Sequence, residues 1–168
     1  MRVLILTCLP LLACGKQSDA GDTGTNSTSV ALQGGLYLIE SAINTNGCGE
    51  WGPNFNDSID GFELEISFPA SDTARFHWQN VQDCPKSVDR VVCETAAPLV
   101  LDDYTPENDV VIMYEDRTDL TWDSATTASG PWIVNLSCEG SQCDLFAEVN
   151  DETYPCSIEM DWTLTLQE

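Results

Sequence analysis

The sequence predicts an all-β domain: an antiparallel, barrel-like meander of about eight or nine strands, with a β-sandwich as the alternative. Three observations lead to this prediction. Apolar and polar residues alternate with a period of two over most of the chain after residue 31, as in strands that bury one face. Turn-forming residues separate these segments at short intervals, which favours hairpins. No segment of about 10–15 residues carries an apolar face at helical spacing, so crossover helices and a parallel sheet are not expected.

The first three strands are bounded by clear turn signals. The segment 36–43 ends before the pair Asn46 and Gly47, and the segment 62–68 begins after Gly61 and is stopped by Pro69. The segment 74–78 follows a polar turn. The predicted strands, in chain order, are residues 36–43, 62–68, 74–78, 91–95, 110–114, 120–123, 132–138, 145–149 and 156–166.

The later strands follow the same rule. The segments 91–95, 110–114 and 120–123 are short, and the segment 132–138 opens after Gly130 and Pro131. The last segment shows the cleanest alternation, with apolar residues at every even position. These residues are Cys156, Ile158, Met160, Trp162, Leu164 and Leu166.

The opening of the domain, Gly34, Gly35, Leu36 and Tyr37, is similar to the Gly-x-aromatic opening of lipocalin-type barrels. The chain departs from that pattern in carrying Tyr instead of Trp and in lacking the Arg that closes the last strand of those barrels. The resemblance implies an up-and-down barrel with room for a small apolar ligand. The tryptophans are expected to pack the core, or to line an apolar cavity if the barrel is wide.

Six cysteines of the β domain predict three disulfides in an oxidising compartment, one of 15 possible connectivities. They are Cys48, Cys84, Cys93, Cys138, Cys143 and Cys156. The spacing favours two local bridges, Cys84 to Cys93 and Cys138 to Cys143, each across a short loop. Cys48, after the first strand, would then reach Cys156 at the start of the last. The C-x4-C pair has no companion pair or nearby His, so no metal site and no cofactor are expected.

The first residues predict export. An apolar run of about ten residues follows Arg2 and is too short to span a bilayer, which takes about 20. It ends in Leu11, Leu12, Ala13 and Cys14, which resembles the signal of bacterial envelope lipoproteins. The resemblance implies that residues 1–13 are removed and that Cys14 is lipidated. The alternative is ordinary cleavage without a lipid.

Residues 14–30 are rich in Ser, Thr, Gly and Asp and predict a flexible tether, which leaves residues 31–168 as one β domain. This layout resembles surface lipoproteins of large-genome Gram-negative bacteria. Because Gly15 stands where enteric lipoproteins retained in the inner membrane carry Asp, the resemblance implies the outer membrane.

The net charge of −22 argues against nucleic acid and anionic lipid surfaces as partners, because both require a basic footprint. It permits divalent cations or cationic partners. The alternative is that the acidic surface serves solubility alone.

Candidate catalytic residues are scarce. The single histidine, His77, alternates with Phe76 and Trp78 and is expected on the polar face of its strand. No nucleophile elbow, zinc-binding helix or phosphate loop is present in the sequence. The densest acidic cluster is expected to be a solvated face, with a calcium or sugar contact as the alternative. It comprises Glu115, Asp116, Asp119 and Asp123, beside Tyr114 and Trp122.

The sequence therefore predicts a monomeric, lipid-anchored envelope protein without catalytic residues, acting as a binding or structural surface module of undetermined ligand. The alternative is a lipocalin-like carrier of a small apolar ligand. An enzyme acting on polysaccharide or peptide is the third hypothesis.

Overall fold

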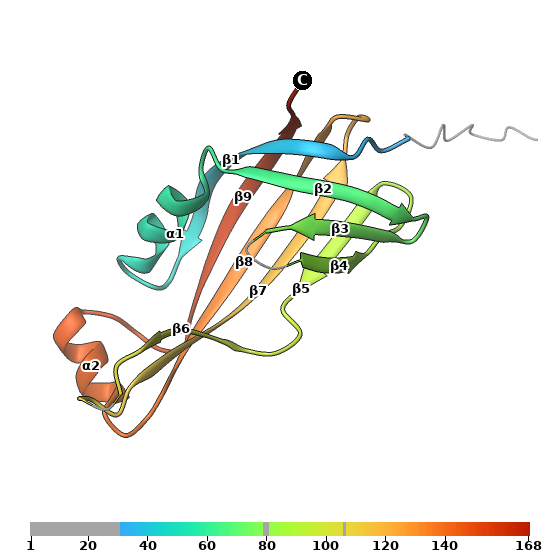
Figure 1. The fold of residues 1–168 in the computed structure, drawn as a ribbon. Coiled ribbons are helices and arrows are strands. Elements are labelled where there is room, and N and C mark those ends of the chain that lie inside the picture. The colour runs from blue at the N-terminus through green and yellow to red at the C-terminus, as the bar shows by residue number, and fades with distance from the viewer. Residues whose placement is uncertain (1–30, 79–80, 106) are drawn as a thin grey trace, which may run out of the picture.

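The computed structural model describes residues 31–78, 81–105 and 107–168. The predicted signal peptide, the predicted lipidation site at Cys14 and the predicted tether lie outside the described residues. Nine strands and two short helices make up the described chain (Figure 1). In order they are β1 (Gly35–Asn46), α1 (Trp51–Ile59), β2 (Glu63–Ala70), β3 (Thr73–His77), β4 (Val81–Pro85), β5 (Arg90–Glu94), β6 (Leu99–Asp103), β7 (Val111–Trp122), β8 (Thr127–Glu139), α2 (Cys143–Asn150) and β9 (Cys156–Leu166).

The strands form one antiparallel sheet in the order β4-β3-β2-β1-β9-β8-β7-β5. Its two edge strands, β4 and β5, meet and nearly close the sheet into a barrel. The Cys84–Cys93 disulfide joins them with a Cα–Cα distance of 4.9 Å, and an isolated bridge pairs Lys86 with Val91. The Gln82 side chain adds a hydrogen bond from Nε2 to the Glu94 carbonyl at 2.8 Å. The predicted barrel-like meander is confirmed.

The strands β5 and β6 act as one interrupted strand along β7. Arg90–Glu94 pair with residues 117–121 of β7, and β6 pairs with residues 111–114. Because β7 and β8 run past the barrel, β6 and α2 lie on their projecting ends (Figure 1). We call residues 99–105, 107–114 and 137–152 the distal arm.

Aromatic side chains fill the barrel. Trp162 is 4% exposed and lies between Trp78, with ring centroids 6.0 Å apart and nearly parallel planes, and Trp132, at 4.8 Å. Tyr37 and Trp122 pack edge to face at 6.4 Å. The alternation predicted for the last strand holds, because its buried residues are those at the even positions 158–164.

Helix α1 covers the same end of the barrel from which the distal arm projects. Its apolar residues Trp51, Phe55 and Ile59 recur every four residues and so share one face. The Phe55 ring meets Trp132 at 5.9 Å, and Ile59 is buried. The sequence did not predict this helix, because nine residues are too few to show a helical period.

The predicted strand at 145–149 is wrong: these residues lie in α2. β8 is already paired on both sides, with β7 and β9. A further strand formed by residues 145–149 would therefore find no free edge of β8 to pair with. The Leu, Ala and Glu residues of this segment are good helix formers, and helix is the remaining way to pair their backbone groups.

Two other boundaries also differ from the prediction. The segments 110–114 and 120–123 belong to one strand, β7, because β8 supplies a partner along most of the polar residues between them. The short strands β4 and β6 were missed. Neither alternates clearly, although each pairs with a strand that is its neighbour in sequence, β4 with β3 and β6 with β7.

Candidate functional site

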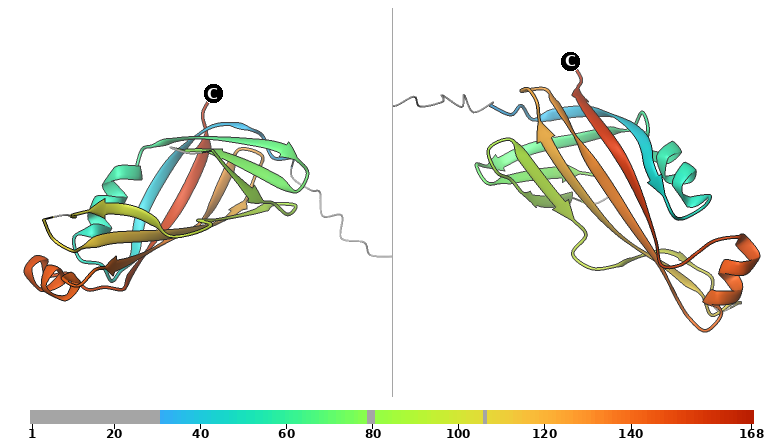
Figure 2. Two further views of the ribbon diagram at one scale, coloured as in Figure 1. Left: turned by 60° about the horizontal axis from the view of Figure 1, so that its bottom comes forward. Right: turned by 180° about the vertical axis from the view of Figure 1, so that it is seen from behind.

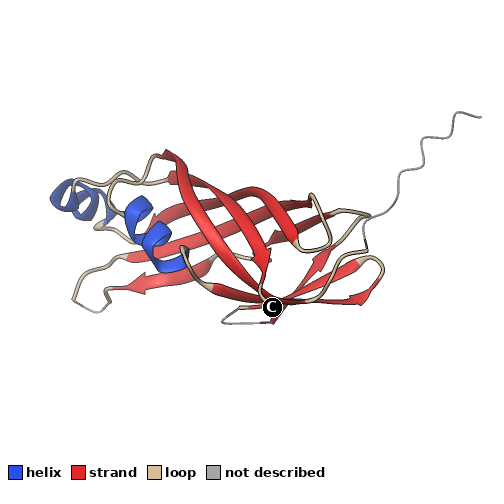
Figure 3. Ribbon diagram, turned by 90° about the horizontal axis from the view of Figure 1, so that it is seen from above, coloured by secondary structure: helices blue, strands red, loops and turns tan. Residues whose placement is uncertain are grey.

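The barrel has two distinct ends. At the proximal end, residues 31–34 lie beside the turn that joins β7 to β8. There Gln33 donates its backbone N–H to the Ala125 carbonyl at 3.1 Å. The turns after β2 and β4 meet there, since the Lys86 N–H bonds the Asp72 carbonyl at 2.8 Å. The distal arm lies at the opposite end (Figure 3).

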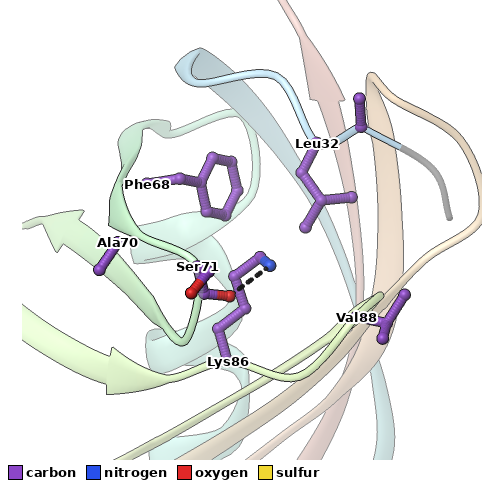
Figure 4. Close-up of a pocket in the computed structure, with 7 residues that line it drawn as sticks. Leu32, Phe68, Ala70, Ser71, Lys86 and Val88 are labelled. Carbon is purple, nitrogen blue, oxygen red and sulfur yellow. Dashed lines mark hydrogen bonds between the residues drawn. The ribbon is translucent and has the colours of Figure 1, made fainter. Parts of the chain in front are cut away.

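An open hollow of about 460 Å³ lies at the proximal end, with apolar walls provided by Leu32, Phe68 and Val88 (Figure 4). Lys86 crosses it: its Nζ donates to the Ser71 carbonyl at 3.1 Å and lies 5.9 Å from the centre of the Phe68 ring. The one lysine of the described residues is thus already engaged by this protein's own groups.

A second hollow, of about 320 Å³, lies in the distal arm between α2 and the loop that joins β6 to β7. We call it the distal groove. Val110, 1% exposed, is its most deeply buried lining residue. The rings of Tyr104 and Phe146 pack with centroids 4.9 Å apart, and Leu145 and Val149 of α2 line the groove while being 58% and 74% exposed.

Helix α2 is held firmly at its start although none of its residues is buried. The Cys138–Cys143 disulfide ties it to β8. Asp109 bonds the preceding turn twice, because its carbonyl accepts from Gln142 N–H at 3.2 Å and its carboxylate accepts from Ser141 N–H at 2.9 Å. The latter bond lowers the pKa of Asp109, since it favours the charged carboxylate.

Gly140 makes this attachment possible. Its φ of +121° is one that L side chains rarely adopt, and a Cβ there would lie 2.0 Å from the Asp109 carbonyl oxygen. The backbone of the β8–α2 turn therefore approaches the β6–β7 loop more closely than any other residue would permit.

Replacing Gly140 by Ala is expected to detach α2 from the loop and to lower the free energy of unfolding by more than the roughly 1 kcal/mol typical of a lost glycine conformation. Gly61→Ala is the matched control, because Gly61 has a φ of +78° but nothing within 4 Å of its Cβ position. Urea unfolding measures the global effect, and amide exchange in α2 locates it. Equal effects of the two substitutions would contradict the role assigned to Gly140.

The distal arm carries only negative formal charge. Its residues include no Lys or Arg, whereas they include nine carboxylates. These are Asp102, Asp103, Glu107, Asp109, Glu139, Asp144, Glu148, Asp151 and Glu152. The C-terminal end of α2 adds the partial negative charge of the helix dipole, with no basic residue in its last turn.

Two tyrosines, Tyr104 in the groove and Tyr154 beside α1, hydrogen-bond to carboxylates of the distal arm. A hydrogen bond with the Asp102 carboxylate raises the pKa of Tyr104 to about 12, since the ionised phenol would lose this bond. Tyr154 donates to Glu152 Oε2 at 2.6 Å and accepts from Trp51 Nε1 at 2.8 Å. Burial raises the pKa of Tyr154, so both phenols stay neutral donors.

The sequence-predicted disulfide residues pair in the structure as the spacing suggested. The bridges are Cys48–Cys156, Cys84–Cys93 and Cys138–Cys143. Each bridge stabilises a different part of the fold. The first joins the distal ends of β1 and β9, the second closes the barrel, and the third fixes α2.

The predicted acidic cluster is divided between the two faces of β7. Asp116 points inward, where it accepts hydrogen bonds from Trp132 Nε1 at 3.0 Å and from the Thr95 hydroxyl. Asp119 points outward and binds Arg90 and Arg117; the Arg90 hydrogen bond lowers its pKa. The four acids therefore do not converge on one ligand.

His77 lies half-buried on the outer face of β3, with Nε2 3.3 Å from the Ser67 hydroxyl. It is remote from the distal groove. Among residues 31–78, 81–105 and 107–168, no three His, Cys, Asp or Glu side chains are grouped so as to hold a metal ion. Within these same residues no helix is long and apolar enough to cross a membrane.

The groove residues Tyr104, Leu145, Phe146 and Val149 were not predicted as a site. The only signal in the sequence was the four-residue spacing of Leu145 and Val149, which was assigned to a strand. No protein-family model, curated protein or solved structure matches the chain.

Proposed function

We propose that this protein is a non-enzymatic binding module of the bacterial envelope, anchored by lipid at Cys14 and binding through the distal arm. Removal of residues 1–13 would leave Cys14 as the first residue of the mature chain. Residues 14–30 would then connect the lipid to the β domain, in the outer membrane by resemblance to enteric lipoproteins.

The observation that carries the proposal is the opposite placement of attachment and groove. Residues 31–34 lie at the proximal end of the barrel, whereas the distal groove lies in the arm beyond the other end (Figures 1 and 2). A tether that reaches the domain through residue 31 would thus hold the groove away from the lipid surface. This is the arrangement that a displayed binding surface needs.

The described domain also has the properties of a rigid scaffold. Three disulfides fix its distal strand ends, its barrel closure and α2. Packed aromatic rings occupy the interior, which leaves the surface hollows as the places for a ligand. The only histidine lies on the outer face of β3, which supports a role in binding without catalysis.

Mass spectrometry of the mature N-terminal peptide tests the anchor. We expect acylated Cys14 as the first residue, and we expect Cys14→Ser to move the protein from the membrane fraction to the soluble fraction. Cys8→Ser is the matched control, because Cys8 lies within the leader and should change neither result. An unmodified Cys14, or a mature chain that starts elsewhere, would refute the anchor.

A second candidate function is a carrier of a small apolar ligand. The proximal hollow favours it, since a volume of about 460 Å³ lies in the range of small-molecule sites, roughly 300–1,000 Å³. Native mass spectrometry separates the two proposals: a carrier would retain one apolar molecule per chain, and Leu32→Ser would release it.

A further inference from the structure

We infer that the distal groove binds a cationic amphipathic polypeptide segment, with apolar side chains of the segment in the groove and Lys or Arg side chains on the acidic rim. The inference rests on the proposed binding function and names the chemical class of the partner. It does not depend on the lipid anchor.

The first argument is the unpartnered apolar face of α2. Leu145 and Val149 lie one helical turn apart and are 58% and 74% exposed, although Val110 and Phe146 beside them are buried or half-buried. An eight-residue helix is marginal in water by itself. Here the disulfide, Asp109 and Gly140 hold it in place, so the fold fixes a surface that contributes no buried residue to the core.

The second argument is the shape of the groove. Its volume of about 320 Å³ is at the lower end of the small-molecule range, and Leu145 and Val149 extend its apolar surface along α2. A helix or extended segment that places two or three apolar side chains along α2 fits this open form, as amphipathic segments do in other grooves.

The third argument is charge complementarity. The distal arm that forms the groove carries nine carboxylates, and it has no basic residue to neutralise them. Glu148 and Asp151 lie at the C-terminal end of α2, where the helix dipole adds further negative potential. Basic side chains of a partner would meet favourable potential at the arm.

The same charges disfavour the other occupants of an apolar surface. In a symmetric dimer each acidic arm would face an identical acidic arm, and like charges across an interface are repulsive. Anionic lipid headgroups and nucleic acid would be repelled in the same way. An amphipathic segment rich in Lys or Arg can place its apolar side chains in the groove and its basic side chains near the carboxylates of the arm.

Fluorescence anisotropy with labelled 18-residue peptides tests the inference on the full chain carrying Cys14→Ser, so that neither acyl chains nor detergent compete. The probe is a helical Leu/Lys peptide with one apolar face. The comparison peptides are a Leu/Lys sequence of the same composition without an apolar face, and a Leu/Glu peptide with the same apolar face.

We expect saturable binding of the amphipathic Leu/Lys peptide alone. Leu145→Ser/Val149→Ser should weaken it at least about tenfold, because both side chains lose apolar contact. Ile43→Ser/Val81→Ser is the matched control, since these residues are 39% and 62% exposed outside the arm and line neither hollow. Near-ultraviolet circular dichroism checks that each variant is folded.

We expect Glu107→Gln/Glu148→Gln to weaken binding about two- to tenfold at low salt, because two exposed charge pairs are lost. Glu63→Gln/Glu65→Gln, on β2, is the control and should leave the affinity unchanged. At about 1 M salt the Debye length falls to about 3 Å, and the effect of the arm substitutions should vanish.

Failure of the Leu/Lys peptide to bind, or equal weakening by the arm and control variants, overturns the inference. If the Leu/Glu peptide binds instead and Leu145→Ser/Val149→Ser abolishes its binding, the partner class is wrong while the binding function of the arm stands. If neither arm variant weakens binding, the peptide binds elsewhere on the protein. That result would refute both the inferred partner class and the binding function of the distal arm.

Discussion

Replacing Cys48 and Cys156 together by Ala is expected to lower the free energy of unfolding by about 4–5 kcal/mol. The bridge closes a loop with a sequence separation of 108 residues. In the chain-entropy model a longer closed loop restricts the unfolded chain more, so this disulfide contributes the most of the three. Guanidinium unfolding of the oxidised proteins, followed by tryptophan fluorescence, measures the difference.

The matched control is Cys138→Ala/Cys143→Ala, whose bridge spans a separation of only 5 residues. The same model gives it about 2 kcal/mol. This variant should also loosen α2 without opening the barrel, because the bridge lies in the distal arm. If both double substitutions lower the free energy of unfolding equally, loop length does not explain the stabilisation.

Trp162→Ala is expected to cost about 3–5 kcal/mol, as large-to-small substitutions at buried aromatic sites do. Trp162 is 4% exposed and lies between Trp78 and Trp132, so its removal leaves a cavity that neighbouring strands cannot collapse to fill. Urea unfolding measures the cost, and near-ultraviolet circular dichroism reports the loss of the coupled indoles.

Trp162→Phe is the control, since a smaller ring retains part of the contact and should cost clearly less than Ala. A cost below about 1 kcal/mol for Trp162→Ala would mean that the barrel interior is loosely packed. That result would favour the carrier function over a scaffold whose ligand binds at the surface.

The acidic composition of the whole chain does not by itself single out the distal groove as a binding site. Most of the 28 acidic residues lie outside the distal arm, and some of them bind arginines, as Asp119 does. What distinguishes the arm is the combination of carboxylates with exposed apolar side chains and the absence of any basic residue in it. Net charge alone does not identify such a place.

Local patterns were sufficient for most of the strands and for the disulfide pairs. In β9, buried side chains alternate with exposed ones because successive residues of a strand point to opposite faces, and this is visible in sequence. Cys138 and Cys143 are near neighbours in the chain, so their bridge followed from spacing even though one end lies in a helix instead of a strand.

Local patterns failed where the outcome depended on edges and partners. Residues 145–149 have an ambiguous pattern, and helix α2 forms because β8 has no free edge left for them. Asp116 and Asp119 are close in sequence but lie on opposite faces of β7, which separates a cluster that looked continuous.

The sequence by itself determined an all-β, disulfide-linked, acidic domain and its expectation of export, because alternation, cysteine spacing, charge and the leader are properties of neighbouring residues. Only the tertiary structure decided that β4 meets β5 to close the barrel. It also decided that Tyr104 and Val149 line one groove, and that this groove lies opposite residues 31–34. The groove joins segments far apart in the chain, and closure of the barrel depends on two strand edges left free by the rest of the sheet, so neither follows from a local pattern alone.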